Sequence, residues 1–160
     1  MRRTTKELGL ERAREKDDAV LNWIEANASY EERRQSLLNL ERRWVRGART
    51  GSERQRIQRG VAEDLVTLAY SFNKPWTEFG KWFRRIQRLG FSNLALRVHL
   101  SCLFLQSLHL FPRRSREAWG LLEDTERRAR RLRRSSPLRE EYLEAIAHAR
   151  KATRVPRPSR

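Results

Sequence analysis

The chain has few of the residues that build covalent cross-links or phosphate-cradling loops. Its 160 residues include one cysteine, Cys102, and seven glycines. A single cysteine excludes a disulfide within the chain. The glycines form neither GxGxxG nor GxxxxGK[ST], and CxxC, HExxH and EF-hand patterns are also missing. We therefore expect no cofactor and no metal.

Long apolar runs are also missing. The opening residues, MRRTTKELGLERAREKDD, lack the apolar core of a signal peptide. The most apolar segment, residues 91–111, approaches membrane length but is interrupted by Arg97, His99, Gln106 and His109. We expect an intracellular, cytoplasmic protein in which this segment is a buried core helix that does not contact a membrane.

Histidines are too few and too poorly spaced to indicate catalysis. His99 and Cys102 are three residues apart and could begin a metal site, but no carboxylate lies on that segment, so a packed core is the better interpretation. Small helical ribonucleases of the HEPN type use an Arg and a His separated by four to six residues. None of the three histidines follows an arginine at that spacing. We expect no enzymatic activity from the single chain.

Acidic residues become scarce in the second half of the chain. The net charge is +16, from 36 basic and 20 acidic residues. Residues 1–72 carry a net +3, residues 73–112 a net +5 with Glu78 as their one acidic group, and residues 113–160 a net +8. Only five of the basic residues are lysines. Arginine suits planar phosphate recognition, although a GC-rich genome also raises its share. The distribution indicates a polyanionic partner.

What is present is helical periodicity. Strand signals are nearly absent, and the pattern predicts an all-α protein of about seven antiparallel helices, a helical-hairpin stack or bundle with helix 92–111 at its centre. Capping boxes begin the first two helices, at Thr4 with Glu7 and at Ser29 with Glu32, and Ser52 with Gln55 is expected to cap the third. We expect one domain over residues 1–152 and a disordered basic tail over 153–160. The helices are expected at 4–27, 29–46, 52–72, 75–90, 92–111, from Ser115, and from Ser136.

One segment resembles a known repeat. Residues 76–83 read W-x2-F-G-x2-F, which is similar to the first-helix signature of a tetratricopeptide repeat. Ser92 fits the small residue expected further on, but His99 stands where the repeat has alanine, and Glu123 stands where a second copy would have glycine. The resemblance covers Trp76–Leu96. It implies a scaffold of stacked hairpins with a protein-binding concave face.

The segment WTEFGKWFRRIQRLG, residues 76–90, combines aromatic and basic residues. At 100° per residue its apolar side chains fall in an arc of about 140° and its basic side chains in a separate arc of about 100°. A separate apolar arc is typical of a core-facing helix rather than of a base-stacking platform. We expect Trp82, near the edge of the arc, to be the aromatic residue with most exposure.

The basic arc indicates either a solvated helix face or a phosphate-binding ridge, because ordinary solvated helices place Glu partners at i±4. A second cluster occupies ERRARRLRR, residues 126–134, and a third occupies FPRRSR, residues 111–116. We expected these cations to lack carboxylate neighbours. The candidate nucleic-acid-binding residues are Lys81, Arg84, Arg85, Arg88, Arg113, Arg114, Arg127, Arg128, Arg130, Arg131, Arg133 and Arg134.

Three functions fit this pattern. The first is a non-enzymatic protein that binds nucleic acid, RNA or a single strand rather than a specific duplex sequence, as an accessory subunit of a nucleoprotein assembly. The second is a protein–protein adaptor of stacked hairpins whose basic face meets an acidic partner. The third, binding to an anionic membrane surface, lacks an exposed apolar face beside the basic one. No small-molecule substrate is indicated.

Overall fold

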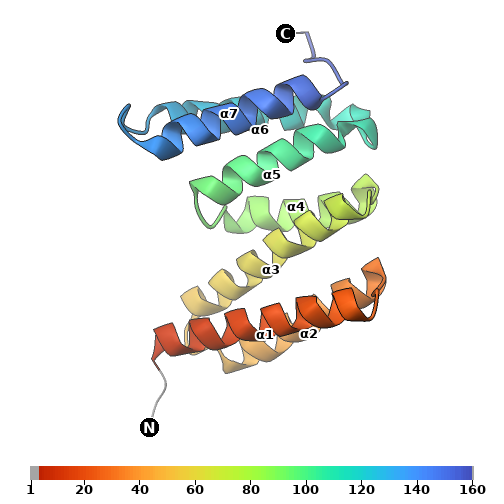
Figure 1. The fold of residues 1–160 in the computed structure, drawn as a ribbon, viewed down its shortest axis with the longest axis vertical. Helices are drawn as coiled ribbons and strands as arrows, with labels where there is room; N and C mark the ends of the chain where they lie inside the picture. Colours follow the sequence, from red (N-terminus) through yellow and green to blue (C-terminus); the bar gives the residue numbers. More distant parts are fainter. Residues whose placement is uncertain (1–3, 160) are drawn as a thin grey trace. The chain divides into compact units, whose positions relative to one another are not determined.

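The computed structural model describes residues 4–159, and within that range the protein is all-helical. Its elements in chain order are α1 (Thr5–Glu25), α2 (Tyr30–Gly47), α3 (Gly51–Ser71), α4 (Trp76–Leu89), α5 (Leu94–Gln106), the 3₁₀ turns η1 (Ser107–His109) and η2 (Pro112–Arg114), α6 (Ser115–Arg130) and α7 (Pro137–Ala152) (Figure 1). The predicted all-α class with seven helices is confirmed. No described residue lies in a strand.

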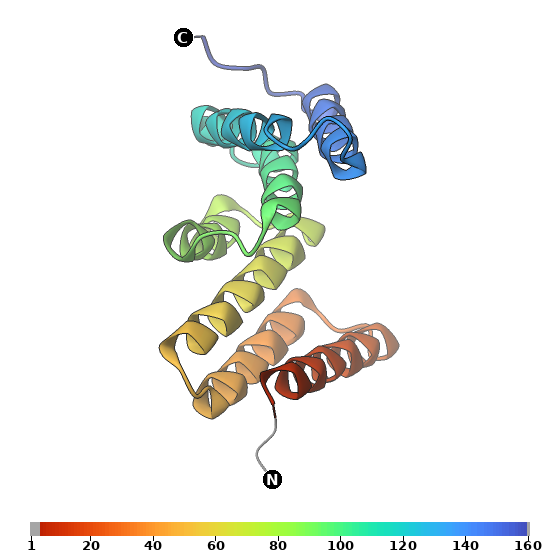
Figure 2. The same ribbon diagram turned by 90° about the vertical axis from the view of Figure 1, so that its left-hand side faces the viewer.

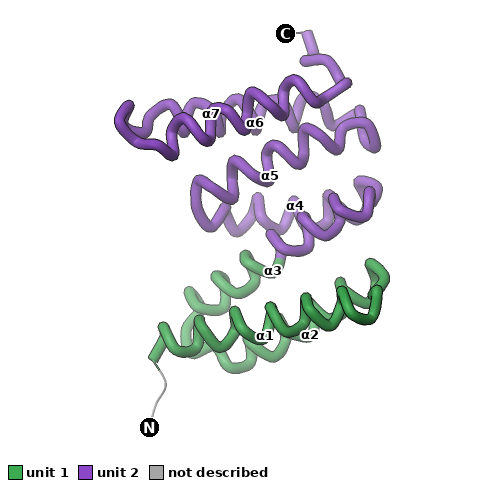
Figure 3. The backbone as a smooth tube through the Cα atoms, in the orientation of Figure 1, with its two compact units in different colours: residues 1–61 green, residues 62–160 purple. Residues whose placement is uncertain are grey.

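The chain divides into two compact units, residues 1–61 and 62–160, and the boundary falls within α3 (Figure 3). The single domain predicted over residues 1–152 stays a prediction. Residues 1–3 and 160 lie outside the described part of the predicted domain and tail.

The first unit is a helical hairpin, α1 and α2, followed by the beginning of α3. Both predicted capping boxes form: the Thr4 and Ser29 hydroxyls accept from the backbone of Glu7 and Glu32, whose carboxylates accept in return. The cap predicted at Ser52 is wrong. The Thr50 hydroxyl accepts the backbone N–H of Glu53 at 3.0 Å, so the cap lies two residues earlier than expected and α3 begins at Gly51.

A buried carboxylate, Glu53, and a half-buried one, Glu15, connect the elements of this first unit. Glu53 accepts from the Arg12 guanidinium at 2.6 Å and from the backbone N–H of Arg49 at 2.8 Å. These two contacts, the backbone one first, hold the pKa of Glu53 below its ordinary value. On the same side of α1, one turn further along, Glu15 accepts from Arg43 and from the Trp44 indole N–H of α2. The same helix is thereby tied to both of its neighbours.

The second unit is built around α5, as the sequence predicts. Every residue from Leu100 to Leu105 is buried, with α4 on one side and α6 and α7 on the other (Figures 1 and 2). The predicted end of this helix at Phe111 is wrong, because α5 stops at Gln106. The chain then turns through η1 and η2, which buries the Phe111 ring 5.2 Å from Phe79 and 6.0 Å from Phe104. Burying this aromatic ring favours the turn over a longer helix.

Candidate nucleic-acid interface

Helix α4 turns its aromatic residues inward. Phe79, Trp82, Phe83 and Ile86 are all buried, so the core interpretation of this arc is confirmed. The expected exposure of Trp82 is wrong. Its side chain is only 5% exposed, because its indole N–H donates to Glu78 at 3.0 Å and the Lys81 ammonium lies 4.6 Å from its ring centroid. The half-exposed aromatic residue of α4 is Trp76.

Gly80 allows Trp76 to lie flat against the helix. A Cβ atom at position 80 would stand 2.5 Å from Cε2 of Trp76, closer than any side chain tolerates. With that space free, the indole stacks on Phe104 of α5 at 5.4 Å and 19°. One turn of α4 thus places an indole ring between the core and the basic surface.

Three of the four predicted cations on α4 are exposed: Lys81, Arg84 and Arg88. None of the three forms an ion pair with another described residue. The fourth, Arg85, is half-buried and has an interaction partner. The α4 ridge, defined here as Lys81, Arg84 and Arg88, therefore carries positive charge that the described residues do not neutralise.

The structure brings the α4 ridge together with the FPRRSR segment. The Arg84 guanidinium lies 5.5 Å from the Trp76 ring centroid, and that of Arg114 in η2 lies 4.5 Å from the same centroid. We call this group, Trp76 with Arg84 and Arg114, the Trp76 clasp. Its one neighbouring carboxylate is Glu117, 3.8 Å from Arg114 and hydrogen-bonded to Gln87 of α4 at 3.3 Å. Arg113, adjacent in the chain, is exposed.

The sequence analysis identified both arginines of the clasp as candidates. It did not predict that they contact the same indole ring, and it placed Trp76 in the core. The two guanidinium groups are held at one indole by cation–π contacts. The spacing of Trp76, Gly80 and Arg84 at intervals of four could have indicated that Arg84 lies near the indole, because residues four apart share a helix face.

The cluster at the end of α6 does have carboxylate partners, contrary to our expectation. Asp124 pairs with Arg127 at 3.3 Å and with Arg128 at 2.9 Å, and Glu126 pairs with Arg130 at 2.7 Å. An acidic residue three or four positions before a basic one can reach it on the same helix. On α6 the acidic residues precede the arginines, and this order is what allows the pairs to form.

The same two carboxylates also accept arginines from neighbouring helices. Arg97 of α5 lies 2.5 Å from Asp124, and Arg150 of α7 pairs with Glu126. Together they connect α5 and α7 to α6 at its C-terminal half. Since five arginines share two carboxylates, the group keeps a net charge of +3.

Ionisation of these groups reflects their pairing. The hydrogen bond from Arg128, followed by the nearby arginine charges, holds the pKa of Asp124 below its ordinary value. Burial alone would raise the pKa of Glu126, but Arg130 and Arg150 outweigh it and the pKa is lowered. Burial and the charge of Arg128 lower the pKa of Arg97. Both carboxylates therefore stay ionised at neutral pH.

The remaining predicted cations lie past the end of α6. Arg131, Arg133 and Arg134 occupy the turn between α6 and α7, where all three are exposed and form no ion pair with another described residue. This turn lies at the same end of the second unit as the turn that follows α4 (Figures 1 and 2). The Trp76 clasp stands at the first turn of α4, at the opposite end of that helix.

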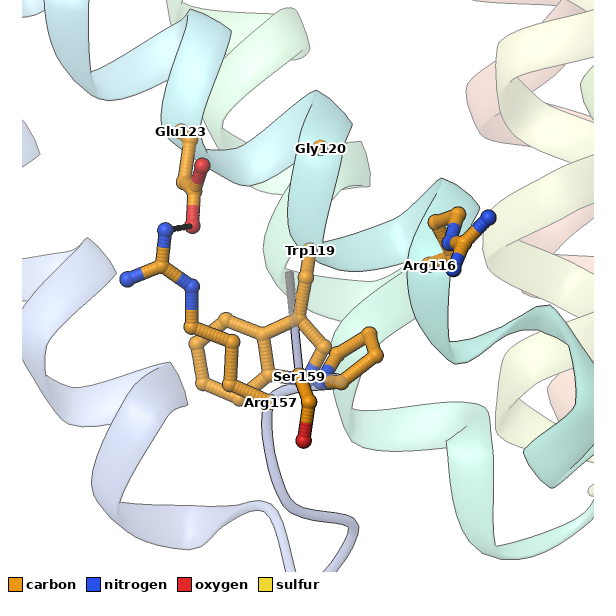
Figure 4. Close-up of a pocket in the computed structure, with 7 residues that line it drawn as sticks. Arg116, Trp119, Gly120, Glu123, Arg157 and Ser159 are labelled. Carbon is orange, nitrogen blue, oxygen red and sulfur yellow. Dashed lines mark ion pairs between the residues drawn. The ribbon is translucent and has the colours of Figure 1, made fainter.

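The disordered tail predicted over residues 153–160 stays a prediction, and Thr153 and Arg157 of this segment contact α5 and α6. Thr153 donates to the Leu105 carbonyl at 3.3 Å, and Arg157 pairs with Glu123 at 2.6 Å. Arg157 and Ser159 also line a pocket of about 410 Å³ around Trp119 (Figure 4). Arg157 is therefore not a free cation, and Arg160 lies outside the described residues.

Residues 4–159 contain no group of three or more His, Cys, Asp or Glu residues able to hold a metal ion. One groove between α5 and α7 is lined by His99, Cys102, Glu144 and His148. The spacing of residues within α5 could not show that α7 lies beside it. Burial raises the pKa of the Cys102 thiol to about 11, so this cysteine is a poor nucleophile at neutral pH.

Comparison of the chain with protein-family models, curated proteins and solved structures found no match. The similarity to a tetratricopeptide repeat therefore stays a prediction. Within residues 4–159, no helix combines the length and apolar character needed to cross a membrane.

Proposed function

We propose that the second unit binds nucleic acid through a basic track that begins at η2, passes the Trp76 clasp and continues along α4. Its residues are Arg113, Arg114, Arg84, Arg88 and Lys81. The observation that carries the proposal is the convergence of Arg84 and Arg114 on one indole, at 5.5 and 4.5 Å from its centroid. Because both guanidinium groups lie at one ring, we expect a single bound phosphate to accept hydrogen bonds from both of them.

The ligand is recognised by its phosphates rather than by its bases. Trp76 stacks on Phe104 and contacts both arginines, and the other aromatic residues of α4 are buried. No aromatic face of α4 is therefore free for a base to stack on. Contacts of this kind give affinity with little sequence specificity, which suits RNA or a single strand held along its backbone. Such binding fits an accessory subunit of a nucleoprotein assembly.

The paired arginines of α6 have a lesser part in this proposal. Arg127, Arg128 and Arg130 already bind Asp124 or Glu126, so a phosphate would have to compete with a carboxylate for each of them. The unpaired residues of the α6–α7 turn, Arg131, Arg133 and Arg134, extend the surface instead.

Charge reversal tests the track. The variant Arg84→Glu, Arg88→Glu, Arg113→Glu should bind a fluorescent single-stranded RNA at least about tenfold more weakly at 0.1 M salt, since each arginine contributes one phosphate contact. The matched control is Arg46→Glu, Arg54→Glu, Arg56→Glu, three exposed arginines of the first unit with the same change in net charge. Equal losses in both variants would mean that affinity follows total charge and not this track.

The second candidate is an adaptor whose basic face binds an acidic protein. Protein purified under native conditions separates the two functions. Co-purified nucleic acid, seen as a raised absorbance ratio that disappears after nuclease treatment, is the expected result. A clean protein that retains one acidic partner in stoichiometric amount would instead support the adaptor.

A further inference from the structure

Helix α1 carries apolar side chains that no other element of the first unit covers. None of its residues is buried. Leu10 is 56% exposed, Leu21 57% and Ile24 65%, and Val20 is 37% exposed. Val20, Leu21 and Ile24 lie within about one turn near the end of α1, and Leu10 lies about three turns earlier on the same side. Exposed large apolar residues grouped on one helix face mark an interaction site. The opposite side of α1 is the one that contacts the rest of its unit, through Arg12 and Glu15.

Charged residues on the exposed side of α1 are sorted by sign. Lys6 and Arg14 flank Leu10 in the first half of the helix, whereas Asp17 and Glu25 flank Leu21 in the second half. At 100° per residue all six side chains fall within an arc of about 100°. The four charged groups are exposed and form no ion pair with another described residue. Glu7, at the edge of this arc, is occupied in the capping box of Thr4.

We propose that this face binds the same face of a second copy of the chain, with the two α1 helices antiparallel. One register sets Leu10 opposite Leu21 of the partner copy, and the same register sets Arg14 opposite its Asp17 and Lys6 opposite its Glu25. Because a two-fold axis repeats each contact, the pair has four ion pairs and two leucine contacts.

The self-complementary order of charges selects a second copy over another partner. A parallel arrangement of the same two helices would set Lys6 against Lys6 and Glu25 against Glu25, which is repulsive. An acidic or basic partner would match one half of the face and repel the other. Only a helix with the reversed order matches both halves, and α1 of a second copy supplies that order.

Sedimentation equilibrium of the full chain tests the pairing. The wild type should approach twice the mass of the chain as its concentration rises. The variant Leu21→Glu should associate at least about tenfold more weakly, since it places a charge at a central apolar contact. The control Leu138→Glu changes a leucine of α7 that is 48% exposed and should associate like the wild type. Circular dichroism checks that both variants remain helical.

Charge exchange gives a second, independent test. One double variant carries Lys6→Glu and Arg14→Glu, and a second carries Asp17→Lys and Glu25→Lys. Each should be monomeric by itself, because every charge pair between its two copies becomes repulsive. Their equimolar mixture should recover the dimer, since every cross-pair between the two variants is again of opposite sign. A wild type that stays monomeric at every concentration, or a dimer that neither set of changes weakens, would overturn the proposal.

Discussion

At the scale of single residues, Gly80 decides the position of Trp76, and Trp76 decides where two arginines meet. The indole occupies the space in which any Cβ at position 80 would lie. With the ring held against Phe104, Arg84 and Arg114 reach it from different elements. A change that adds one methyl group at this glycine therefore alters both the packing of α4 and the basic surface.

Gly80→Ala should destabilise the protein by about 1–3 kcal/mol, because the added Cβ overpacks the indole. Gly120→Ala is the matched control, since it also changes a glycine within a helix and its added Cβ would meet no atom within 4 Å. That change should stabilise by about 0.5–1 kcal/mol through reduced freedom of the unfolded chain. Urea denaturation measures both. A stable Gly80→Ala variant would show that the indole does not need this close approach.

The sequence shows a glycine at position 80 but not why a larger side chain would not fit there. The pattern W-x2-F-G-x2-F indicated a repeat-like helix, whereas the role of Gly80 depends on a ring four residues earlier and on Phe104 in the next helix. Trp82 shows the opposite limit. A helical wheel placed it at the edge of the apolar arc, but the ring is buried and its indole N–H donates to Glu78.

At the scale of elements, local signals were read more accurately than distant ones. The capping boxes of α1 and α2 depend on residues three apart and form as predicted. The end of α5 depends on Phe111 reaching Trp76 and Phe79, a tertiary contact that no spacing within the segment could show. The same holds for Arg97 and Asp124, which lie on different helices and meet at 2.5 Å.

Asp124 connects α5 to α6, so its ionisation should control the stability of this part of the fold. The folded-state pKa lies below the ordinary value of 3.8, chiefly because of the hydrogen bond from Arg128. The stabilisation is therefore complete above the ordinary pKa and is lost as pH falls through the lower folded value. Asp124→Asn should lower stability by roughly 1 kcal/mol at neutral pH, the usual size for partly exposed pairs.

The pH dependence separates this effect from simple loss of packing. The difference in melting temperature between wild type and Asp124→Asn should be largest above the ordinary pKa of 3.8 and should shrink as the pH falls through the lower folded-state pKa, because Asp124 then becomes neutral like the asparagine. Glu144→Gln, at an exposed position of α7, should show little difference at any pH. A constant difference across this range would mean that the charge of Asp124 does not stabilise the fold.

At the scale of the whole molecule, the charge distribution along the sequence indicates a basic surface in the second half of the chain. It does not indicate which of the basic residues lack a carboxylate partner. The excess of basic residues after residue 72 was evident from composition. Which arginines remain available depends on the fold, because Asp124, Glu126 and Glu123 are placed to bind several of them. The free cations that remain lie mainly on α4, in η2 and in the α6–α7 turn.

The most direct test of the account is the salt dependence of binding to a single-stranded RNA. Each phosphate neutralised on a single strand contributes about 0.7 to the slope of log K against log salt. The variant Arg84→Gln, Arg88→Gln, Arg113→Gln should therefore have a slope shallower than that of the wild type by about 2. The control Arg46→Gln, Arg54→Gln, Arg56→Gln should keep the wild-type slope. Equal slopes in all three proteins, or no binding by the wild type at low salt, would contradict the account.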